Sequence, residues 1–476
     1  MEKICKSYID GKWVSPKSSS PIKRFNPADL REEVSEILFA DDRLAEYAVE
    51  KANGAAAYWR KTSIVKRIEL VEKFLELFIS NRNKLAGIIT KENGKTLSES
   101  YSEIDSALRE SNYQIEFLRN STVEQIGNSK IIYEPLGVVL LITPWNFPVA
   151  TILRKLIPAL LTGNTIIVKP SELTPLSSVA LFKLFEEVDF LNGVINLVLG
   201  DGNVGSYLCR HPFVKAISLT GSSITGNVIL KQISGRNVRL QAEMGGKNTV
   251  VVLKDANIEK AAKDIVYSSY ACSGQWCTGT SKVIAEKEVY DLLMQRLIDH
   301  TSKIVIGNGF DENVTMGPLI SQAQLDKTLN AVTQANNEKA KLVIGGEKPR
   351  ENALEYGYFF EPTIYSNVKP EMFISQEEIF GPVLSVLKAE NFDDALKLTN
   401  ISKYGLAFSI YTNVSEKAEE FIKDVKAGVC HINLPTSYRD PALPLLGWEN
   451  SGYGLPESGR FARDFFTRTK VIYKAE

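Results

Sequence analysis

Histidine and cysteine are both scarce in this sequence. Its 476 residues include three histidines, none at metal-ligand spacing from another, and five cysteines without a Cys-x-x-Cys pair. A metal site is therefore not expected. The odd number of scattered cysteines favours reduced thiols over a disulfide framework. The scarcity of histidine also means that any cysteine nucleophile would have to be activated without one.

Long apolar runs and an excess of charge are also missing. The longest apolar runs, such as residues 137–142, are too short to span a bilayer. The first six residues lack the apolar stretch of a signal peptide. The formal net charge of −1 gives no electrostatic footprint for nucleic acid or a membrane surface. The length allows two or three globular domains, and a cytoplasmic location is the expectation.

From residue 137 onward, strands and helices are expected to alternate. Strands are predicted at residues 138–142, 165–168, 194–199, 214–219 and 238–242. Helices are predicted between them, at residues 149–161, 177–188, 204–209 and 224–233. This alternation predicts a doubly wound parallel sheet, which binds its ligands beyond the carboxyl ends of its strands.

A second alternating series follows Gly245 and Gly246. Its strands are predicted at residues 249–253, 281–285, 341–344, 384–389, 406–411 and 429–432. Its helices are predicted to include residues 258–272, 289–303 and 321–336. The two series together predict two α/β domains that join near residues 243–247.

The remaining segments lie mostly at the two ends of the chain. Helices are predicted at residues 42–59, 65–91 and 103–118, and strands at residues 7–14 and 131–133. Residues 434–459, rich in proline and glycine, are expected to form a long ordered loop. Residues 467–473 read as a terminal strand, which needs a partner within the chain or on another subunit.

Cys277 lies in a short run of glycine, serine and threonine at residues 273–280. A helical segment precedes this run and a strand follows it. A thiol on a loop between two rigid elements is reachable, which is where a nucleophile belongs. The alternative is a buried structural cysteine, the commonest state of a free thiol.

Two polar side chains follow or end predicted strands. Asn146 lies in the block TPWNFP at residues 143–148, and a positioned amide is what an oxyanion site requires. Its alternative role is to cap the following helix. Glu243 ends a strand before two glycines, where a carboxylate can take a proton from water. Its alternative role is a salt bridge at the strand end.

Three further blocks could hold a dinucleotide. Residues 169–172 (KPSE) place a lysine and a glutamate past a strand, suited to ribose hydroxyls or to a solvated charge pair. The glycines of the turn at 221–226 would let backbone approach a phosphate, or simply join strand to helix. Glu378 and Phe380 would share one side of a strand, suiting a sugar beside a flat ring or a half-buried strand.

Taken in chain order, these blocks resemble the NAD(P)-dependent aldehyde dehydrogenase superfamily over nearly the whole chain. The matching blocks are TPWNFP at 143–148, KPSE at 169–172, the turn at 221–226, EMGGK at 243–247, GQWC at 274–277, EIFGP at 378–382 and NSGYG at 450–454. The resemblance implies an aldehyde dehydrogenase-like α/β fold, with two doubly wound α/β domains plus a small β oligomerisation element. The implied dinucleotide-binding domain is 1–118 and 136–244, the catalytic domain 245–445, and the oligomerisation strands 119–135 and 460–476.

By that resemblance, Cys277 is the nucleophile, Asn146 donates to the oxyanion, and Glu243 is the general base. The implied cofactor-binding residues are Thr143, Trp145, Lys169, Ser171, Glu172, Gly202, Gly221, Ser222, Glu378 and Phe380. The implied reaction oxidises an aldehyde to a carboxylic acid through a thiohemiacetal and a thioester. NAD is the expected cofactor, with NADP as the alternative, because the Glu172 carboxylate would repel a 2′-phosphate.

Arg154 indicates the kind of aldehyde. It lies on the helix after the Asn146 block, where the chain resembles succinate semialdehyde dehydrogenases in carrying arginine. A guanidinium binds a carboxylate through two donors, so a small aldehyde with an anionic or polar tail is expected. Trp276, Thr278 and Arg439 are the other candidate substrate residues. The alternative is that Arg154 only pairs with a surface acid.

Other functions remain open from the sequence alone. α-Ketoglutaric semialdehyde, lactaldehyde or glyceraldehyde, and a broad range of aldehydes are alternative substrates. Relatives that pass the thioester to coenzyme A tend to lack a base at the Glu243 position, and a non-catalytic member would not need the catalytic residues. The family implies a homodimer or homotetramer assembled through residues near 120–134 and 467–473. Neither nucleic acid nor a membrane is an expected partner.

Overall fold

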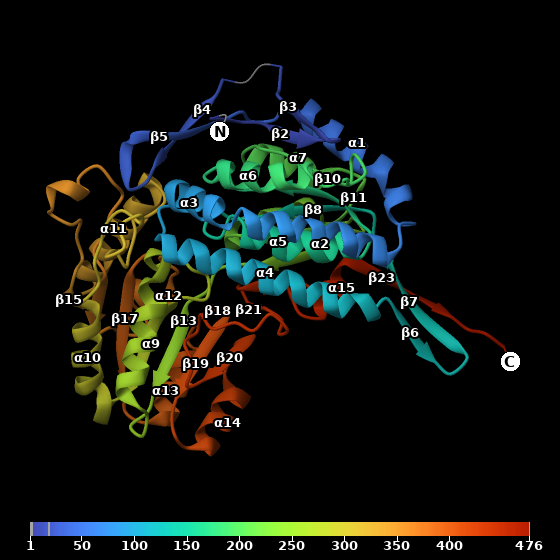
Figure 1. The fold of residues 1–476 in the computed structure, drawn as a ribbon. Coiled ribbons are helices and arrows are strands. Elements are labelled where there is room, and N and C mark those ends of the chain that lie inside the picture. Colours follow the sequence, from blue (N-terminus) through green and yellow to red (C-terminus); the bar gives the residue numbers. More distant parts are fainter. Residues whose placement is uncertain (1–2, 18–19, 476) are drawn as a thin grey trace.

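Two large sheets dominate the computed structural model, which describes residues 3–17 and 20–475 (Figure 1). The first has the strand order β22-β12-β11-β8-β9-β10-β2-β3. Strands β12 to β10 are parallel, and β22, β2 and β3 pair antiparallel at the edges. These strands are β2 (Ser7–Ile9), β3 (Lys12–Val14), β8 (Val138–Ile142), β9 (Thr165–Lys169), β10 (Ile195–Leu197), β11 (Val214–Thr220), β12 (Arg239–Glu243) and β22 (Gly452–Tyr453). The strand predicted at residues 7–14 is thus a hairpin, because Asp10 and Gly11 turn the chain at φ of 56° and 77°.

Helices from the first half of the chain accompany this sheet. They are α1 (Asp42–Trp59), α2 (Ile64–Ser80), α3 (Arg82–Asn93), α4 (Leu97–Asn120), α5 (Ala150–Leu161), α6 (Pro175–Glu186), α7 (Gly202–Arg210) and α8 (Ser223–Gln232). Residues 65–91, predicted as one helix, form two. The break lies at Asn81, whose backbone leaves the helical region at φ of −100° and ψ of 11°, and whose side-chain amide also donates to the Leu77 carbonyl.

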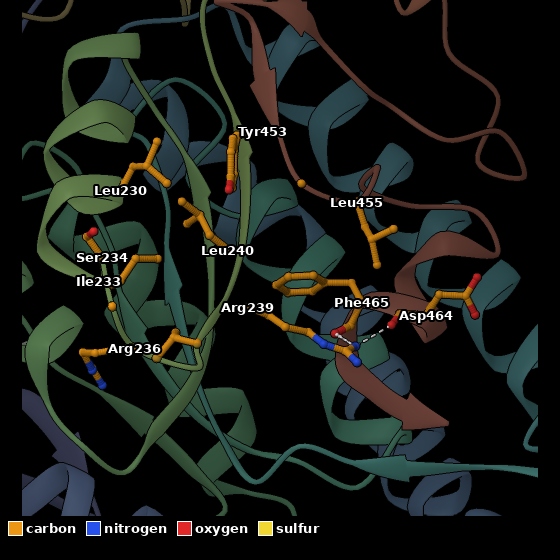
Figure 2. Close-up of a pocket in the computed structure, with 13 residues that line it drawn as sticks. Leu230, Ile233, Ser234, Arg236, Arg239, Leu240, Tyr453, Leu455, Asp464 and Phe465 are labelled. Atoms are coloured by element: carbon orange, nitrogen blue, oxygen red, sulfur yellow. Dashed lines mark hydrogen bonds between the residues drawn. The ribbon is translucent and has the colours of Figure 1, made fainter. Parts of the chain in front are cut away.

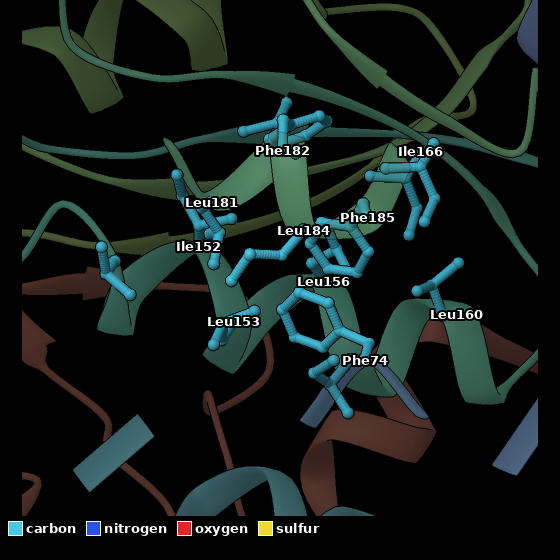
Figure 3. Close-up of a cluster of buried hydrophobic side chains, with 14 of the residues drawn as sticks. Phe74, Ile152, Leu153, Leu156, Leu160, Ile166, Leu181, Phe182, Leu184 and Phe185 are labelled. Atoms are coloured by element: carbon cyan, nitrogen blue, oxygen red, sulfur yellow. The ribbon is translucent and has the colours of Figure 1, made fainter. Parts of the chain in front are cut away.

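The core of this half lies between α2, α5, α6 and β9 (Figure 3). The Phe74 and Phe185 rings stack with centroids 3.8 Å apart. Helix α5 is buried along almost its whole length, because most of its residues are apolar and its two charged residues, Arg154 and Lys155, pair with buried acids. Each fully buried large apolar side chain contributes roughly 1.5–3 kcal/mol, so this packing fixes α5, the helix that follows Asn146.

The second sheet has the order β15-β16-β17-β14-β13-β19-β20, with β15 antiparallel to β16. Its strands are β13 (Asn248–Val252), β14 (Thr280–Glu286), β15 (Lys341–Ile344), β16 (Thr363–Ser366), β17 (Val383–Ala389), β19 (Ala407–Tyr411) and β20 (Val429–Ile432). Its helices are α9 (Ile258–Tyr270), α10 (Lys287–Thr301), α11 (Gln322–Asn337), α12 (Phe373–Gln376), α13 (Phe392–Asn400) and α14 (Ser415–Asp424), with short 3-10 turns η1 (Ala271–Gly274) and η2 (Asn352–Leu354). The α/β class and both parallel series predicted from the sequence are confirmed.

Smaller sheets complete the fold. They are β1 (Ile4–Cys5) with β5 (Asp29–Ile37) and β4 (Ile22–Asn26), β18 (Tyr404–Gly405) with β21 (Trp448–Glu449), and β23 (Thr467–Ile472) with β7 (Ser129–Pro135) and β6 (Val123–Ile126). The partner of the terminal strand is therefore β7 of the same chain, and the β6–β7 hairpin protrudes from the body (Figure 1). Residues 460–476, predicted as oligomerisation strands, begin instead with helix α15 (Phe461–Phe466), which is anchored by buried Phe465 and Phe466. The predicted domain boundaries stay a prediction.

No helix within the described residues is both long and apolar enough to cross a membrane.

The two large sheets follow one another directly along the chain. Strand β12 ends at Glu243 and β13 begins at Asn248, so the carboxyl ends of the first sheet lead directly into the amino ends of the second. Loops from both sheets therefore converge at this junction.

Candidate active site

One cavity of about 370 Å³ collects residues from both sheets. Asn146 follows β8, Glu243 ends β12, and Cys277 precedes β14, yet all three line this cavity. The four predicted substrate residues, Arg154, Trp276, Thr278 and Arg439, line it as well. Tertiary structure thus brings together residues that lie far apart in sequence.

The turn before Cys277 has an unusual backbone shape. Three consecutive residues, Cys272, Ser273 and Gly274, have φ of 53°, 58° and 70°, in the left-handed region that favours glycine. The turn ends α9 at Tyr270, so the helix predicted to reach residue 272 stops two residues earlier. Left-handed non-glycine residues persist where surrounding contacts over-determine them, and they are frequent at functional sites.

The Cys277 thiol is partly buried and lies against Leu406 and Leu445. Burial raises the pKa of the thiol to about 11, while the positive charges of Arg154 and Arg439 act to lower it. Burial therefore favours the protonated thiol in the resting site. The loop alone does not produce a thiolate, and the two arginines are the groups in the cavity that favour one.

Asn146 is buried, and its side-chain amide donates to the Gln275 carbonyl at 3.0 Å. The alternative role as a helix cap is not observed. Glu103 accepts instead from the backbone N–H groups of Val149 and Ala150, at 2.9 and 3.0 Å, where α5 begins. Because the amide carries two hydrogens, the second remains available to the cavity.

Glu243 is 4% exposed, and its Oε2 has no hydrogen-bond partner among the described residues. Burial, reinforced by the nearby negative charge of Glu457, raises the pKa of the Glu243 carboxyl well above its ordinary value, against the opposing charge of Lys155. The alternative of a strand-end salt bridge is not observed in the part of the chain that the structure describes. A buried carboxyl with a free oxygen beside a thiol is suited to proton transfer.

Arg154 lies on the cavity wall, but acids already bind it. Its Nε and Nη2 donate to Glu110 at 2.6 and 3.1 Å, and Glu457 lies 3.7 Å from its Nη1. Glu110 is buried, so the alternative of an ion pair is observed with a buried acid rather than a surface one. Arg439 has fewer and longer contacts with acceptors, because its Nη2 is 3.3 Å from Ser458 Oγ and 3.7 Å from Glu110.

The predicted ribose-binding block lies at the carboxyl end of β9. Lys169 is buried and its Nζ donates to the Pro170 carbonyl at 2.9 Å. Burial lowers the pKa of the Lys169 amine. The Ser171 hydroxyl accepts from the Leu173 N–H, and Glu172 is half-buried beside it. The block is thus an ordered edge of the sheet rather than a fully solvated loop.

The glycine turn lies between β11 and α8. Ser222 is the cap of α8, and its hydroxyl accepts from the Thr225 N–H at 3.2 Å. This is the ordinary joining role that was the alternative interpretation, and it leaves the first backbone N–H groups of α8 for an anion. Gly221 precedes the cap, and Gly202 is the exposed first residue of α7.

Glu378 and Phe380 do not lie on a strand, and that prediction is wrong. The segment is irregular, and Phe380 has a φ of 61°, so the side chains do not follow strand alternation. Glu378 is held in another way, because its Oε1 accepts from the Gly246 N–H at 3.0 Å. Any side chain at Gly245 would collide with this carboxylate, which explains the glycine there.

The two remaining predicted cofactor residues, Thr143 and Trp145, follow strand β8. The Trp145 ring meets the Phe380 ring edge to face, with centroids 5.4 Å apart. Thr143 is buried, and its hydroxyl has no partner among the described residues. The paired rings and the fixed carboxylate of Glu378 fit a flat ring with an attached sugar, and the free buried hydroxyl of Thr143 is a polar group without a partner at the end of β8. The residues present therefore suit a nicotinamide dinucleotide.

Several residues of the site were missed from the sequence. Glu99, Glu103 and Arg109 line the cavity from α4, and Arg154 is paired by Glu110 of the same helix and by Glu457 of the long loop that includes β21 and β22. Charges on a helix usually indicate a solvated face, so these charges did not by themselves indicate a site. The hydrophilic residues at 98, 99, 102, 103 and 106 were the available hint that one side of α4 faces a polar cavity.

A larger groove of about 710 Å³ lies between α8, β12 and α15 (Figure 2). Its walls include the apolar side chains of Leu230, Leu240 and Phe465. Arg239 crosses one end and donates to the carbonyls of Asp464 and Phe465. No cysteine, and no acid other than Asp464, lines this groove within the described residues. It is therefore not a competing catalytic site.

Comparison with known proteins identifies the class of protein that this fold and site define. A model of the aldehyde dehydrogenase family matches residues 13–472. An α-ketoglutaric semialdehyde dehydrogenase of Bacillus subtilis is 36% identical, covering 98% of this chain and 97% of that protein. A D-glyceraldehyde dehydrogenase (NADP(+)) of Picrophilus torridus is also 36% identical, covering 95% and 94%. The chain belongs to the aldehyde dehydrogenase family.

Solved structures of aldehyde dehydrogenases lead to the same conclusion. Betaine aldehyde dehydrogenase of Staphylococcus aureus in complex with NAD+ superposes with a TM-score of 0.94 at 34% identity, covering 98% of this chain and 94% of that one. A 3,6-anhydro-L-galactose dehydrogenase in complex with NAP gives 0.95 at 31% identity, covering 99% and 100%. The predicted family, fold class and enzyme class are confirmed. The predicted use of NAD, or NADP as the alternative, is borne out for the family by these two complexes.

Proposed function

We propose that this aldehyde dehydrogenase oxidises a small aldehyde with an anionic or polar tail, such as succinate semialdehyde, to the corresponding carboxylic acid. The observation that carries the proposal is the single cavity that holds Cys277, Asn146 and Glu243 together with the guanidinium groups of Arg154 and Arg439. The relatives named for α-ketoglutaric semialdehyde and glyceraldehyde support the same class of small polar aldehydes.

The chain's own residues account for the covalent steps. The Cys277 thiolate, favoured by the two arginines, attacks the aldehyde carbon and forms a thiohemiacetal. The Asn146 amide and the Cys277 backbone N–H donate to the oxyanion that forms. After oxidation to the thioester, Glu243 takes a proton from water, which attacks the carbonyl and releases the acid.

A bound nicotinamide dinucleotide supplies the hydride acceptor in this scheme. Lys169 and Glu172 would hold the adenosine ribose, and the turn before α8 the pyrophosphate. Glu378 would hold the second ribose, with Phe380 beside the ring. The free Thr143 hydroxyl and the glycine that makes room for Glu378 support this assignment. The remaining predicted cofactor residues, Trp145, Ser171, Gly202, Gly221 and Ser222, would complete the site.

The charge of the cavity supports an anionic tail. Arg154, Lys155 and Arg439 are balanced by only two ionised acids, Glu110 and Glu457, whose pKa values nearby cations hold below the ordinary range. These five side chains therefore carry one net positive charge while Glu243 is protonated, and the cavity wall also holds the acids Glu99 and Glu103. Since Arg154 is bound by Glu110, the freer guanidinium of Arg439 is the better receptor for a carboxylate. Arg109 adds a further cation on the wall, with no hydrogen bond or salt bridge to any other described residue.

One assay separates the candidate reactions. The protein is incubated with NAD and either succinate semialdehyde or propanal, with and without coenzyme A. NADH formation without coenzyme A, and free acid as the product, are expected. Dependence on coenzyme A would identify an acylating enzyme, and no NADH with any aldehyde would identify a non-catalytic member. A higher catalytic efficiency with propanal would contradict the proposed anionic tail of the substrate but not the oxidation of an aldehyde.

Replacement of Arg439 should weaken binding of the anionic substrate selectively. Arg439→Gln is expected to raise KM for succinate semialdehyde about tenfold relative to propanal, equivalent to about 1.4 kcal/mol. Arg439 also acts on the Cys277 thiol, but that effect is the same for both aldehydes and cancels in the ratio of their KM values. Arg119→Gln is the matched control, because Arg119 is on α4 but pairs with Glu72 at the surface. Equal effects on both aldehydes would contradict the carboxylate role.

Replacement of Glu172 should relax the choice of cofactor. Glu172→Gln removes the charge that would repel a 2′-phosphate, so the ratio of kcat/KM with NADP to that with NAD should rise about tenfold. The wild-type chain should prefer NAD. Glu187→Gln, at the exposed end of α6, is the control. A wild-type preference for NADP would overturn this assignment.

We also infer assembly with further copies of the chain. Strand β6 is exposed along its length and forms an edge of the small sheet, and Ile126 on it is 60% exposed. An open edge of this kind presents unpaired backbone groups that can pair with another chain. A homodimer or homotetramer is expected by sedimentation.

A further inference from the structure

Three charged side chains around the start of α4 contact the backbone on both sides of the site. Glu99 and Glu103 are four residues apart on α4, a separation that places both on one helix face, and Lys95 lies two residues before the helix begins at Leu97 after the Thr96 cap. Glu99 and Glu103 also line the cavity. None of the three takes part in the reaction described above.

Lys95 and Glu103 act on the Asn146 side. Lys95 Nζ donates to Glu103 Oε2 and to the Asn146 carbonyl, both at 2.7 Å, and lies 4.0 Å from the centre of the Phe147 ring. The other Glu103 oxygen accepts from two backbone N–H groups at the start of α5. The pair is almost fully buried, with side-chain exposures of 1% and 0%. It therefore holds the chain immediately at and after Asn146.

Glu99 acts on the nucleophile side. Its Oε1 accepts from the Cys272 N–H at 2.6 Å, and its Oε2 accepts from the Thr96 N–H at 2.8 Å. Cys272 is the first of the three left-handed residues before Cys277. The bond from Cys272 therefore ties that turn to the start of α4.

The two sides meet at Gln275. Its carbonyl accepts from the Asn146 amide at 3.0 Å, and its own N–H donates to the Cys272 carbonyl at 3.0 Å. The amide and the thiol loop are thus fixed to each other and, independently, to one rigid helix. A shift of either contact on α4 would change the distance between the amide and the reacting carbon, to which oxyanion stabilisation is sensitive.

We propose that Lys95, Glu99 and Glu103 are positioning residues that set the Asn146 amide relative to Cys277. This inference rests on the proposed function of Asn146 and Cys277. The residues act through the backbone at 146 and 272 and have no part in the bond-forming steps. Their removal should therefore slow thiohemiacetal formation and oxidation, while the intrinsic reactivity of the thiol and the affinity for NAD stay unchanged.

The test uses Lys95→Met/Glu103→Gln, which removes both charges and leaves no buried ion without a partner. With enzyme in excess over succinate semialdehyde and NAD saturating, the single-turnover rate of NADH formation should fall about 10²-fold, as when an oxyanion donor is lost. Alkylation of Cys277 by iodoacetamide and the Kd for NAD should stay within about twofold of wild type. Arg82→Met is the control, because Arg82 joins α3 to α4 through Asp105 away from the cavity.

A double-mutant cycle with Asn146→Ala decides whether the effect passes through the amide. In that background the Lys95/Glu103 change should cost little more, since the group it positions is gone. Multiplying losses, or a parallel loss of NAD binding, would overturn the proposal. If the double variant does not fold, Glu99→Gln carries the test, with an expected loss of about tenfold and the same cycle. Absence of NADH with the wild-type protein would instead contradict the proposed function.

Discussion

Cys277→Ala is expected to lower kcat for aldehyde oxidation by about 10⁴-fold or more, to the background rate. Alanine has no nucleophile, and loss of a covalent nucleophile removes most of the catalysis of an enzyme that depends on one. The fold and the Kd for NAD should persist, because the side chain is small and packs only at the edge of a minor apolar cluster with Leu406 and Leu445. NADH formation and thermal unfolding of the same preparation measure both outcomes.

Cys272→Ala is the matched control for this variant. Cys272 lines the same cavity, five positions earlier, but burial raises the pKa of its thiol even further above the ordinary range. It should remain inert, and its loss should change kcat little. Turnover retained in Cys277→Ala, or lost only in Cys272→Ala, would show that the nucleophile has been assigned to the wrong thiol.

Glu243→Gln is expected to separate the two halves of the reaction. Oxidation of the thiohemiacetal precedes hydrolysis, so the variant should still form about one equivalent of NADH per active site. Steady turnover should then fall by about 10²–10⁴-fold, the usual contribution of a general base. Rapid-mixing absorbance measures the initial NADH, and mass spectrometry of the quenched protein detects the acyl group on Cys277. A missing first equivalent would show that Glu243 acts earlier.

The pH dependence of the steady rate should also identify Glu243 as the general base. Glu243 acts as a base only when it is ionised, and its pKa is raised by burial and Glu457. The steady rate should therefore be low in acid and rise with pH through this raised pKa, above the range of an ordinary glutamate. The thiol, with a pKa of about 11, adds a rise in the same direction. In Glu243→Gln, the rise in rate at lower pH that Glu243 causes should disappear, while the rise at higher pH that the Cys277 thiol causes should remain. An unchanged pH profile would contradict the role of Glu243 as general base.

The parallel architecture was predictable because its signals are local. Strands buried on both faces are continuous apolar runs, and the helices between them carry apolar residues at helical spacing. Residues 42–59 and 138–142 accordingly match α1 and β8 at both ends. The site residues at strand ends were predictable for a related reason, since Asn146 and Glu243 are polar groups directly after or at the end of buried strands, where a parallel sheet binds its ligands.

Local backbone shape was less predictable. The left-handed residues before Cys277 and at Phe380 are stabilised by distant atoms, including Glu99, which is 173 positions from Cys272. The prediction that Glu378 and Phe380 alternate along a strand is therefore wrong. The helix predicted through residue 272 ended early for the same reason, because intrinsic propensity is overridden where tertiary contacts hold a strained turn.

The sequence by itself determined the α/β class and, through the order of its motifs, the chemistry expected of Cys277, Asn146 and Glu243. Only the tertiary structure decided the charge of the site. Arg154 is bound by Glu110, 44 positions away, and Lys155 by Glu457, 302 positions away. These ion pairs form because burial makes an unpaired charge costly, and that cost depends on which segments pack together. The partner of each arginine, and hence its freedom to bind a substrate carboxylate, follows from the packing and not from local sequence.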